Sequence, residues 1–172
     1  MPRMTGARAV PRLNIRVAAA LDCGATDAWE AAHSPGVAEQ LYRSLLQMQP
    51  LGAASFPTRF SSGSRIDVAL LLLGKLRLGS QRIVIEDRID SVAVVERRTM
   101  RDSGRPLSGP LSMLRSWNHE ITVIPVDDRA CTWQDVLTIS GWFAPLAACV
   151  LFPLWRWRAI KLRRLAREWG VE

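Results

Sequence analysis

An uncharged run near the C-terminus places the strongest constraint on what this chain can fold into. From residue 136 to residue 155, 20 consecutive residues carry no Asp, Glu, Lys or Arg, and an arginine-rich segment follows. A run of this length with a basic flank is typical of a helix that spans a membrane. One hypothesis is therefore a membrane-associated protein held by residues 136–167.

The pattern inside the run favours a different structure. Residues 132–140 alternate apolar and polar side chains, as a half-buried strand does, and Gly141 interrupts them. Only residues 142–155 then remain as an apolar helix before the first arginine, and this segment is too short to cross a bilayer. We therefore expect a strand that ends at Ser140 and a long C-terminal helix over residues 142–169.

The rest of the chain predicts one strand, two short helices and then several strands in succession. Alternating apolar and polar residues predict a strand over residues 13–21. A helix capped by Thr26 should follow, and apolar residues three to four apart predict a second helix over residues 35–49. Residues 52–64 are rich in Gly, Ser and Pro and predict a loop, with at most a short strand near residues 58–60. The later strands are expected at residues 65–73, 81–89, 91–101, 111–124 and 129–140.

This order of elements is typical of an α+β fold in which helices pack on one face of a curved antiparallel sheet. A chain of 172 residues has room for one ordinary domain. We expect residues 13–172 to form it and residues 1–12 to be a flexible basic leader. The leader contains no apolar run like that of a secretion signal, so we expect a cytoplasmic location, at most peripheral to a membrane.

Charge and cysteine content argue against several other classes of protein. The net charge of +7 comes from the two ends of the chain, and the segment between them is close to neutral. A basic groove for nucleic acid is therefore not expected. The three cysteines lie far apart and only two histidines are present, so neither a disulfide framework nor a metal site is predicted. We also expect no cofactor.

The last two strands can be paired residue by residue. A turn around Asp127 predicts a hairpin that places His119 opposite Asp135. A slip of one residue would turn a polar set of side chains toward the core, so the side on which each residue lies is better determined than its exact partner. The inner face is expected to carry Arg115, Trp117, His119, Ile121 and Val123 on one strand and Cys131, Trp133, Asp135, Leu137 and Ile139 on the other.

This register brings two titratable groups, His119 and Asp135, together on an apolar face. A carboxylate that holds an imidazole fixes its tautomer and raises its pKa, which suits a general acid or base or a polar anchor for a ligand. The pair can equally be structural, because two buried polar groups satisfy each other. No serine, cysteine or lysine is placed beside the pair as a nucleophile.

The chain resembles the SRPBCC superfamily over roughly residues 13–169. The resemblance rests on the order of elements, the LGKLRLG run at residues 73–79, the RSWNH run at residues 115–119, Asp135 in the next strand and the arginine-rich closing helix. This superfamily has the helix-grip fold and includes START domains, polyketide cyclase-like proteins and pollen-allergen-type binding proteins. The resemblance implies a sheet of about seven strands around the long C-terminal helix, with an apolar cavity between them.

Members of this superfamily bind lipids, sterols, polyketides and other hydrophobic molecules, and some catalyse cyclisation or dehydration. The resemblance implies binding or transport of a hydrophobic small molecule such as a lipid or polyketide. The alternative is a cyclase or dehydratase that uses His119 and Asp135 as acid and base. The candidate ligand-binding residues are Arg115, Trp117, His119, Ile121, Trp133, Asp135 and Leu137.

The basic half of the terminal helix suggests a second partner. Anionic lipid headgroups attract Lys and Arg side chains near a membrane surface, and a solvated helix face is the simpler alternative. The residues concerned are Arg156, Arg158, Lys161, Arg163, Arg164 and Arg167.

Overall fold

The computed structural model describes residues 10–52, 55–92 and 95–169. The predicted leader therefore lies outside the described residues up to residue 9, and Arg12 already belongs to the first strand. The strands are β1 (Arg12–Leu21), β2 (Leu46–Pro50), β3 (Arg65–Leu72), β4 (Leu76–Val92), β5 (Val95–Asp102), β6 (Arg105–Ser108), β7 (Ser116–Asp127) and β8 (Ala130–Ser140). The helices are α1 (Ala25–His33), α2 (Pro35–Tyr42), the 3-10 turn η1 (Pro110–Met113), α3 (Ala144–Leu165) and the 3-10 turn η2 (Ala166–Glu168).

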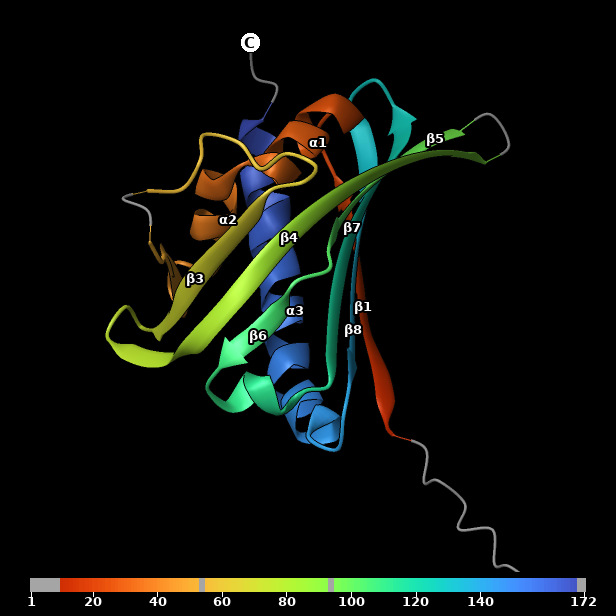
Figure 1. The fold of residues 1–172 in the computed structure, drawn as a ribbon. Coiled ribbons are helices and arrows are strands. Elements are labelled where there is room, and N and C mark those ends of the chain that lie inside the picture. Colours follow the sequence, from red (N-terminus) through yellow and green to blue (C-terminus); the bar gives the residue numbers. More distant parts are fainter. Residues whose placement is uncertain (1–9, 53–54, 93–94, 170–172) are drawn as a thin grey trace, which may run out of the picture.

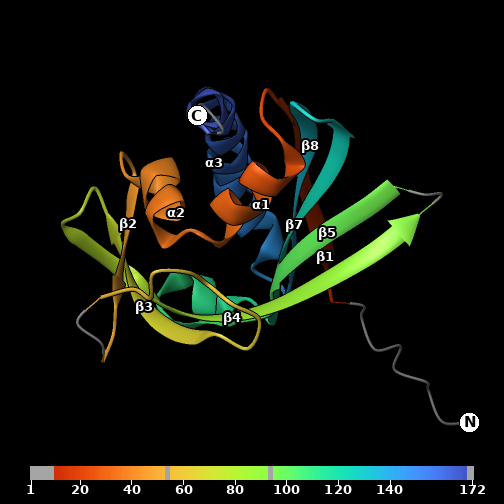
Figure 2. The same cartoon turned by 90° about the horizontal axis from the view of Figure 1, so that it is seen from above.

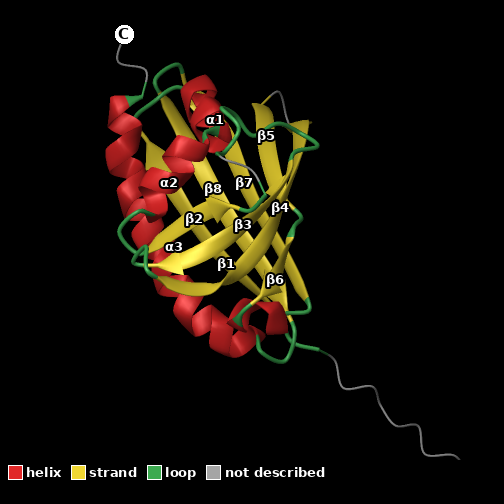
Figure 3. Cartoon of the chain, turned by 60° about the vertical axis from the view of Figure 1, so that its left-hand side comes forward, coloured by secondary structure: helices red, strands yellow, loops and turns green. Residues whose placement is uncertain are grey.

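The strands form one curved antiparallel sheet in the order β1-β8-β7-β5-β4-β3-β2, and β6 pairs with β4 beside this path. The sheet bends around α3, which runs along its concave side with α1 and α2 near one end (Figures 1 and 2). The three helices lie on the same side of the sheet (Figure 3). The predicted α+β helix-grip architecture is confirmed, with eight strands in place of about seven.

The uncharged run is divided between two elements, as its pattern indicated. Residues up to Ser140 belong to β8, Gly141 adopts a φ of 126°, and α3 begins at Ala144. Pro145 occupies the first turn of α3, where its missing N–H costs nothing. No helix among the described residues combines the length and the apolar content needed to cross a membrane.

Two buried apolar clusters lie between the sheet and α3. One cluster joins the N-terminal half of α3, including Leu151 and Trp155, to β1, β7 and β8. The other joins the C-terminal end of α3, at Leu162, to α1, α2 and the strands β1, β3, β4, β5, β7 and β8. Because α3 contributes to both clusters, its position on the sheet determines the space that remains between them.

The prediction of a single helix over residues 35–49 is wrong. Helix α2 ends at Tyr42, and Leu46 and Met48 pair with Leu72 and Leu70 of β3. The apolar residues of this segment face the same interior whether they lie on a helix or on a strand, so their spacing did not reveal the change. Residues 46–50 form a strand because they pair with β3, which would otherwise be the edge of the sheet.

Three smaller expectations also differ from the structure. Gly24, and not Thr26, is the N-cap residue of α1, and no side chain caps it. The segment near residues 58–60 forms no strand. Strand β6 lies in the segment between the strands expected at residues 91–101 and 111–124. Gly109 follows β6 and lies so close to β4 that a Cβ on it would be 1.8 Å from the carbonyl oxygen of Leu78.

The hairpin of β7 and β8 has the predicted facing but a different register. His119 pairs with Leu137, and Ile121 pairs with Asp135, because the turn lies between Asp127 and Ala130 and is not centred on Asp127, so the register differs from the predicted one by two residues. A shift of two preserves the side on which each residue lies. Arg115 is the exception to the predicted inner face, since it precedes β7 and is exposed.

The turn between β3 and β4 yields a test of local stability. Leu73 and Gly74 both have positive φ, 51° and 71°, which is typical of a type I′ turn that prefers Asn-Gly. The side chain of Leu73 is 63% exposed, so little packing is lost on replacing it. We expect Leu73→Asn to raise the free energy of unfolding by roughly 0.5–1 kcal/mol, measured by urea denaturation.

The matched control is Leu73→Ala, which removes the apolar side chain without favouring a positive φ. It should give no gain. An equal gain from both variants would show that exposure of Leu73, and not its backbone conformation, limits stability.

Candidate functional site

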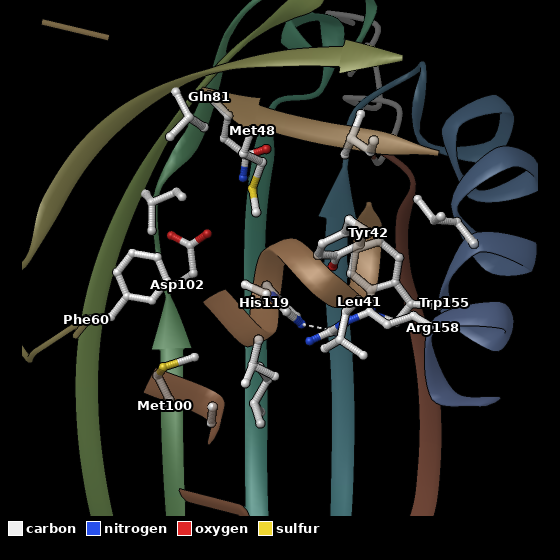
Figure 4. Close-up of a pocket in the computed structure, with 18 of the residues that line it drawn as sticks. Leu41, Tyr42, Met48, Phe60, Gln81, Met100, Asp102, His119, Trp155 and Arg158 are labelled. Carbon is white, nitrogen blue, oxygen red and sulfur yellow. Dashed lines mark hydrogen bonds between the residues drawn. The ribbon is translucent and has the colours of Figure 1, made fainter. Parts of the chain in front are cut away.

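A pocket of about 140 Å³ lies between the concave face of the sheet and the three helices (Figure 4). A cavity of this size has room for about one aromatic ring. Most of its wall is apolar, which suits a hydrophobic molecule. The apolar lining includes Ala31, Val37, Leu41, Leu46, Met48, Phe60, Val68, Leu70, Ile83, Ile85, Met100, Ile121, Trp133, Leu151 and Leu154.

Polar side chains interrupt this wall at a few positions. They come from separate elements of the fold: α2, β4, β5, β7 and α3. Only the tertiary structure brings them to one pocket, and no short sequence motif contains them. They are Tyr42, Gln81, Asp102, His119 and Arg158 (Figure 4).

Behind His119, a buried cluster of hydrogen bonds is centred on Asp135. Arg158 Nη1 donates to Asp135 Oδ2, and Trp155 Nε1 donates to Asp135 Oδ1 over 2.8 Å. His119 Nε2 lies 2.6 Å from the same Oδ1. Burial alone would raise the pKa of Asp135, but the charges of Arg158 and His119 and the hydrogen bonds outweigh it and lower the pKa to about 2.

Arg158 is an interior residue, with only 4% of its surface exposed. Burial disfavours its charged form, yet the neighbouring Asp135 carboxylate keeps the guanidinium pKa above its ordinary value. The guanidinium also lies 5.3 Å from the ring centre of Tyr42. The expectation that Arg158 is available to a membrane surface is therefore wrong, because this side chain points toward the sheet.

The structure brings together only part of the predicted ligand-binding set. Trp117, His119, Ile121 and Trp133 line the pocket. Asp135 is covered by its partners and does not line the pocket, although its side chain meets His119 as the sequence predicted. Leu137 is buried in the cluster beneath the N-terminal half of α3, and Arg115 lies at the surface.

Asp102 lines the pocket and was missed by the sequence analysis. It pairs with His119 across β5 and β7. Asp102 Oδ1 accepts hydrogen bonds from the backbone N–H groups of Val84 and Gly104, both over 2.9 Å. Gly104 can approach only because it has no Cβ, which would lie 1.8 Å from the carbonyl oxygen of Arg82. Burial raises the pKa of Asp102 above its ordinary value, against these two hydrogen bonds.

His33, Cys23 and Cys131 are titratable side chains that are buried outside the pocket. His33 is fully buried, with Nδ1 2.9 Å from the carbonyl oxygen of Trp29 and Nε2 3.0 Å from Asp87 Oδ1. Cys23 and Cys131 are both buried and reduced. Across the described ranges, no three His, Cys, Asp or Glu side chains are grouped so that they could hold a metal ion.

The sheet that bends around a long helix, with a pocket between them, defines a helix-grip protein. Norcoclaurine synthase from Thalictrum flavum, solved as a point mutant with a transition-state analogue, is similar over 93% of this chain and 97% of its own, with a TM-score of 0.55 and 16% identity. A protein from Arthrobacter aurescens is similar over 94% and 92%, with a TM-score of 0.63 and 11% identity.

A START superfamily protein from Mycobacterium smegmatis is also similar, over 90% of this chain and 97% of its own, with a TM-score of 0.50 and 9% identity. No protein-family model and no curated protein matches the sequence. Similarity at these identities shows the fold alone. The chain has the helix-grip fold, and the predicted resemblance is confirmed at the level of the fold.

The buried pair predicts a large and pH-dependent effect of Arg158→Met. Removing the guanidinium leaves Asp135 as an uncompensated buried charge, so the free energy of unfolding should fall by about 3–5 kcal/mol at pH 7. The pKa of Asp135 is about 2 against an ordinary 3.8, so the ionised pair contributes stability above pH 3.8 that is lost as the pH falls toward 2. Urea denaturation should therefore show the wild type and Arg158→Met converging below pH 4.

Arg156→Met is the matched control, because Arg156 is exposed two residues earlier on the same helix. It should change the free energy of unfolding by no more than about 0.5 kcal/mol at any of these pH values. A pH-independent loss in Arg158→Met would show that packing of the side chain, and not its charge, is what matters.

Proposed function

We propose that this protein binds a hydrophobic small molecule, such as a lipid or a polyketide-like compound, in the pocket between its sheet and α3. The observation that carries the proposal is the pocket itself, whose wall is apolar except for a few side chains from separate elements. The volume of about 140 Å³ matches a single ring, which is the part of a ligand that this conformation holds. Binding of a hydrophobic molecule without chemical conversion requires only this apolar wall and no catalytic side chain.

The arrangement of His119 and Asp135 favours binding over acid–base catalysis by the pair. Asp135 accepts from Arg158 and Trp155 and is covered by them, so it positions His119 and has no access to a ligand. His119 alone reaches the pocket, with 13% of its side chain exposed. A cyclase or dehydratase built on this pair would therefore have to use His119 for every proton transfer, with Asp135 only as its positioning group.

Pocket binding can be tested with toluene, which has the size of the pocket and no polar group. Isothermal titration calorimetry should show one toluene bound per chain. Leu154→Trp, in the pocket wall on α3, should weaken toluene binding about tenfold or more by filling the space. Phe152→Trp, two residues away and exposed, should bind toluene as the wild type does.

His119→Gln tests whether binding of an apolar ligand depends on the imidazole. Toluene affinity should change little, because an apolar ligand requires no proton transfer. Failure of the wild type to bind toluene, or equal losses in Leu154→Trp and Phe152→Trp, would rule out the pocket as the binding site.

We also propose that the outer face of α3 docks on membranes that contain anionic lipids. Its N-terminal half exposes Leu146, Val150 and Phe152, each about half exposed or more. Its C-terminal half exposes Arg156, Arg163 and Arg164, and Arg167, which is ion-paired with Asp22, follows in η2. No Asp or Glu occurs between residues 136 and 167. Apolar side chains beside arginines, without acids, match the chemistry of an anionic lipid surface.

Flotation with vesicles tests this docking. The wild type should bind vesicles of phosphatidylcholine with 30% phosphatidylglycerol and not vesicles of phosphatidylcholine alone. Arg163→Gln with Arg164→Gln should weaken binding roughly 30-fold, since each basic residue contributes about 1 kcal/mol. The control, Arg88→Gln with Arg97→Gln, removes the same charge from β4 and β5 and should bind as the wild type does.

Equal losses in the two double variants would show attraction by net charge alone and contradict a docking face on α3. A dimer that dissociates in Val150→Ser, detected by light scattering, would also contradict it, because a second copy would then cover the face.

A further inference from the structure

The two carboxylates near His119, those of Asp135 and Asp102, differ in their hydrogen-bond and ion-pair partners. Asp135 is held by a guanidinium, an imidazole and an indole. Asp102 has no ion pair with any Lys, Arg or His among the residues described, and it uses only Oδ1, which accepts from two backbone amides. Asp102 Oδ2 has no hydrogen-bond partner within the described ranges.

The free oxygen of Asp102 can be reached from the pocket. Three side-chain nitrogens there also lack partners, those of Trp117, Trp133 and Arg158 Nε, but each is enclosed by protein atoms. Asp102 Oδ2 is not among the enclosed atoms. In Figure 4 the carboxylate rises from β5 into the space flanked by Phe60, on the same side of the sheet as His119.

The nearby cations are already committed. Arg158 donates to Asp135, and His119 Nε2 faces Asp135 as well, so neither side chain hydrogen-bonds to Asp102, and His119 lowers the pKa of Asp102 only by its charge. The Asp102 carboxylate is therefore a negative group in a mostly apolar pocket wall. A buried carboxylate without an ion-pair partner destabilises the protein, and a hydrogen-bond donor that enters the pocket offsets part of this effect.

We propose that Asp102 is the polar anchor of the pocket and that the ligand carries a hydrogen-bond donor, best an ammonium group, on a hydrophobic body. This inference rests on the proposed function, in which the pocket holds a hydrophobic molecule. The backbone amides of Val84 and Gly104 hold Oδ1, so the carboxylate is oriented before the ligand arrives. A ligand carboxylate would meet a like charge and is excluded.

Four compounds that share one ring test the proposal: toluene, benzyl alcohol, benzylamine and benzoate. Calorimetry at pH 7 with the wild type should show benzylamine bound about tenfold or more tighter than benzoate, with benzyl alcohol between them. Asp102→Asn keeps an acceptor for the two amides and should remove most of this preference while toluene affinity stays within about threefold. Asp90→Asn, an exposed position on β4 with the same loss of charge, should keep the wild-type ranking.

The outcomes separate this inference from the proposed function. If toluene does not bind the wild type, the proposed function fails, and the inference fails with it. If toluene binds but benzoate binds as tightly as benzylamine, the proposed pocket binding stands and the proposal that Asp102 is the polar anchor fails. The same conclusion follows if Asp102→Asn preserves the ranking. Should Asp102→Asn fail to fold by circular dichroism, the wild-type ranking decides alone.

Discussion

The buried ion pair of Arg158 and Asp135 is the constraint on which the rest of the site depends. It joins the middle of α3 to the centre of β8 at the point where the two apolar clusters meet. Apolar packing tolerates small rotations of a helix, but an unpaired guanidinium in this interior would be too costly. The pair therefore fixes how α3 is rotated on the sheet and which of its side chains face the pocket.

The same pair determines the electrostatics of the pocket. By taking up Arg158 and one nitrogen of His119, Asp135 leaves Asp102 without an ion-pair partner among the described residues, and His119 lowers the pKa of Asp102 only by its charge. Two carboxylates a few strands apart thus have opposite pKa shifts: the pKa of Asp135 is lowered by its charged partners and that of Asp102 is raised by burial. One carboxylate belongs to the scaffold, and the other offers a free oxygen at the pocket wall.

The sequence was most informative where a two-residue period decides the structure. The alternation of apolar and polar residues predicted correctly which side chains of β7 and β8 face the core, although the predicted register was two residues off. Burial of the apolar side chains fixes the side of the sheet on which each residue lies, whereas only the turn fixes which residues pair. Arg158 was assigned to the surface from its charge, although Leu154 and Leu162 one turn away on either side indicate an inward face. Asp102 directly follows the strand expected at residues 91–101, and its Oδ1 accepts a hydrogen bond from the N–H of Gly104, as in a turn. Its inward position depends on the pairing of β5 with β7, and spacing along the chain does not encode that pairing.

Helix-grip proteins of very different sequence share this architecture, so the fold does not select the ligand. In this chain we propose that the selection rests on polar pocket side chains that each come from a different element. Such positions can change without disturbing the apolar clusters, whereas the Arg158–Asp135 pair cannot lose one member. Ligand preference should therefore vary at Gln81 and Asp102 more readily than at Asp135, because only the first two face the pocket without holding the helix in place.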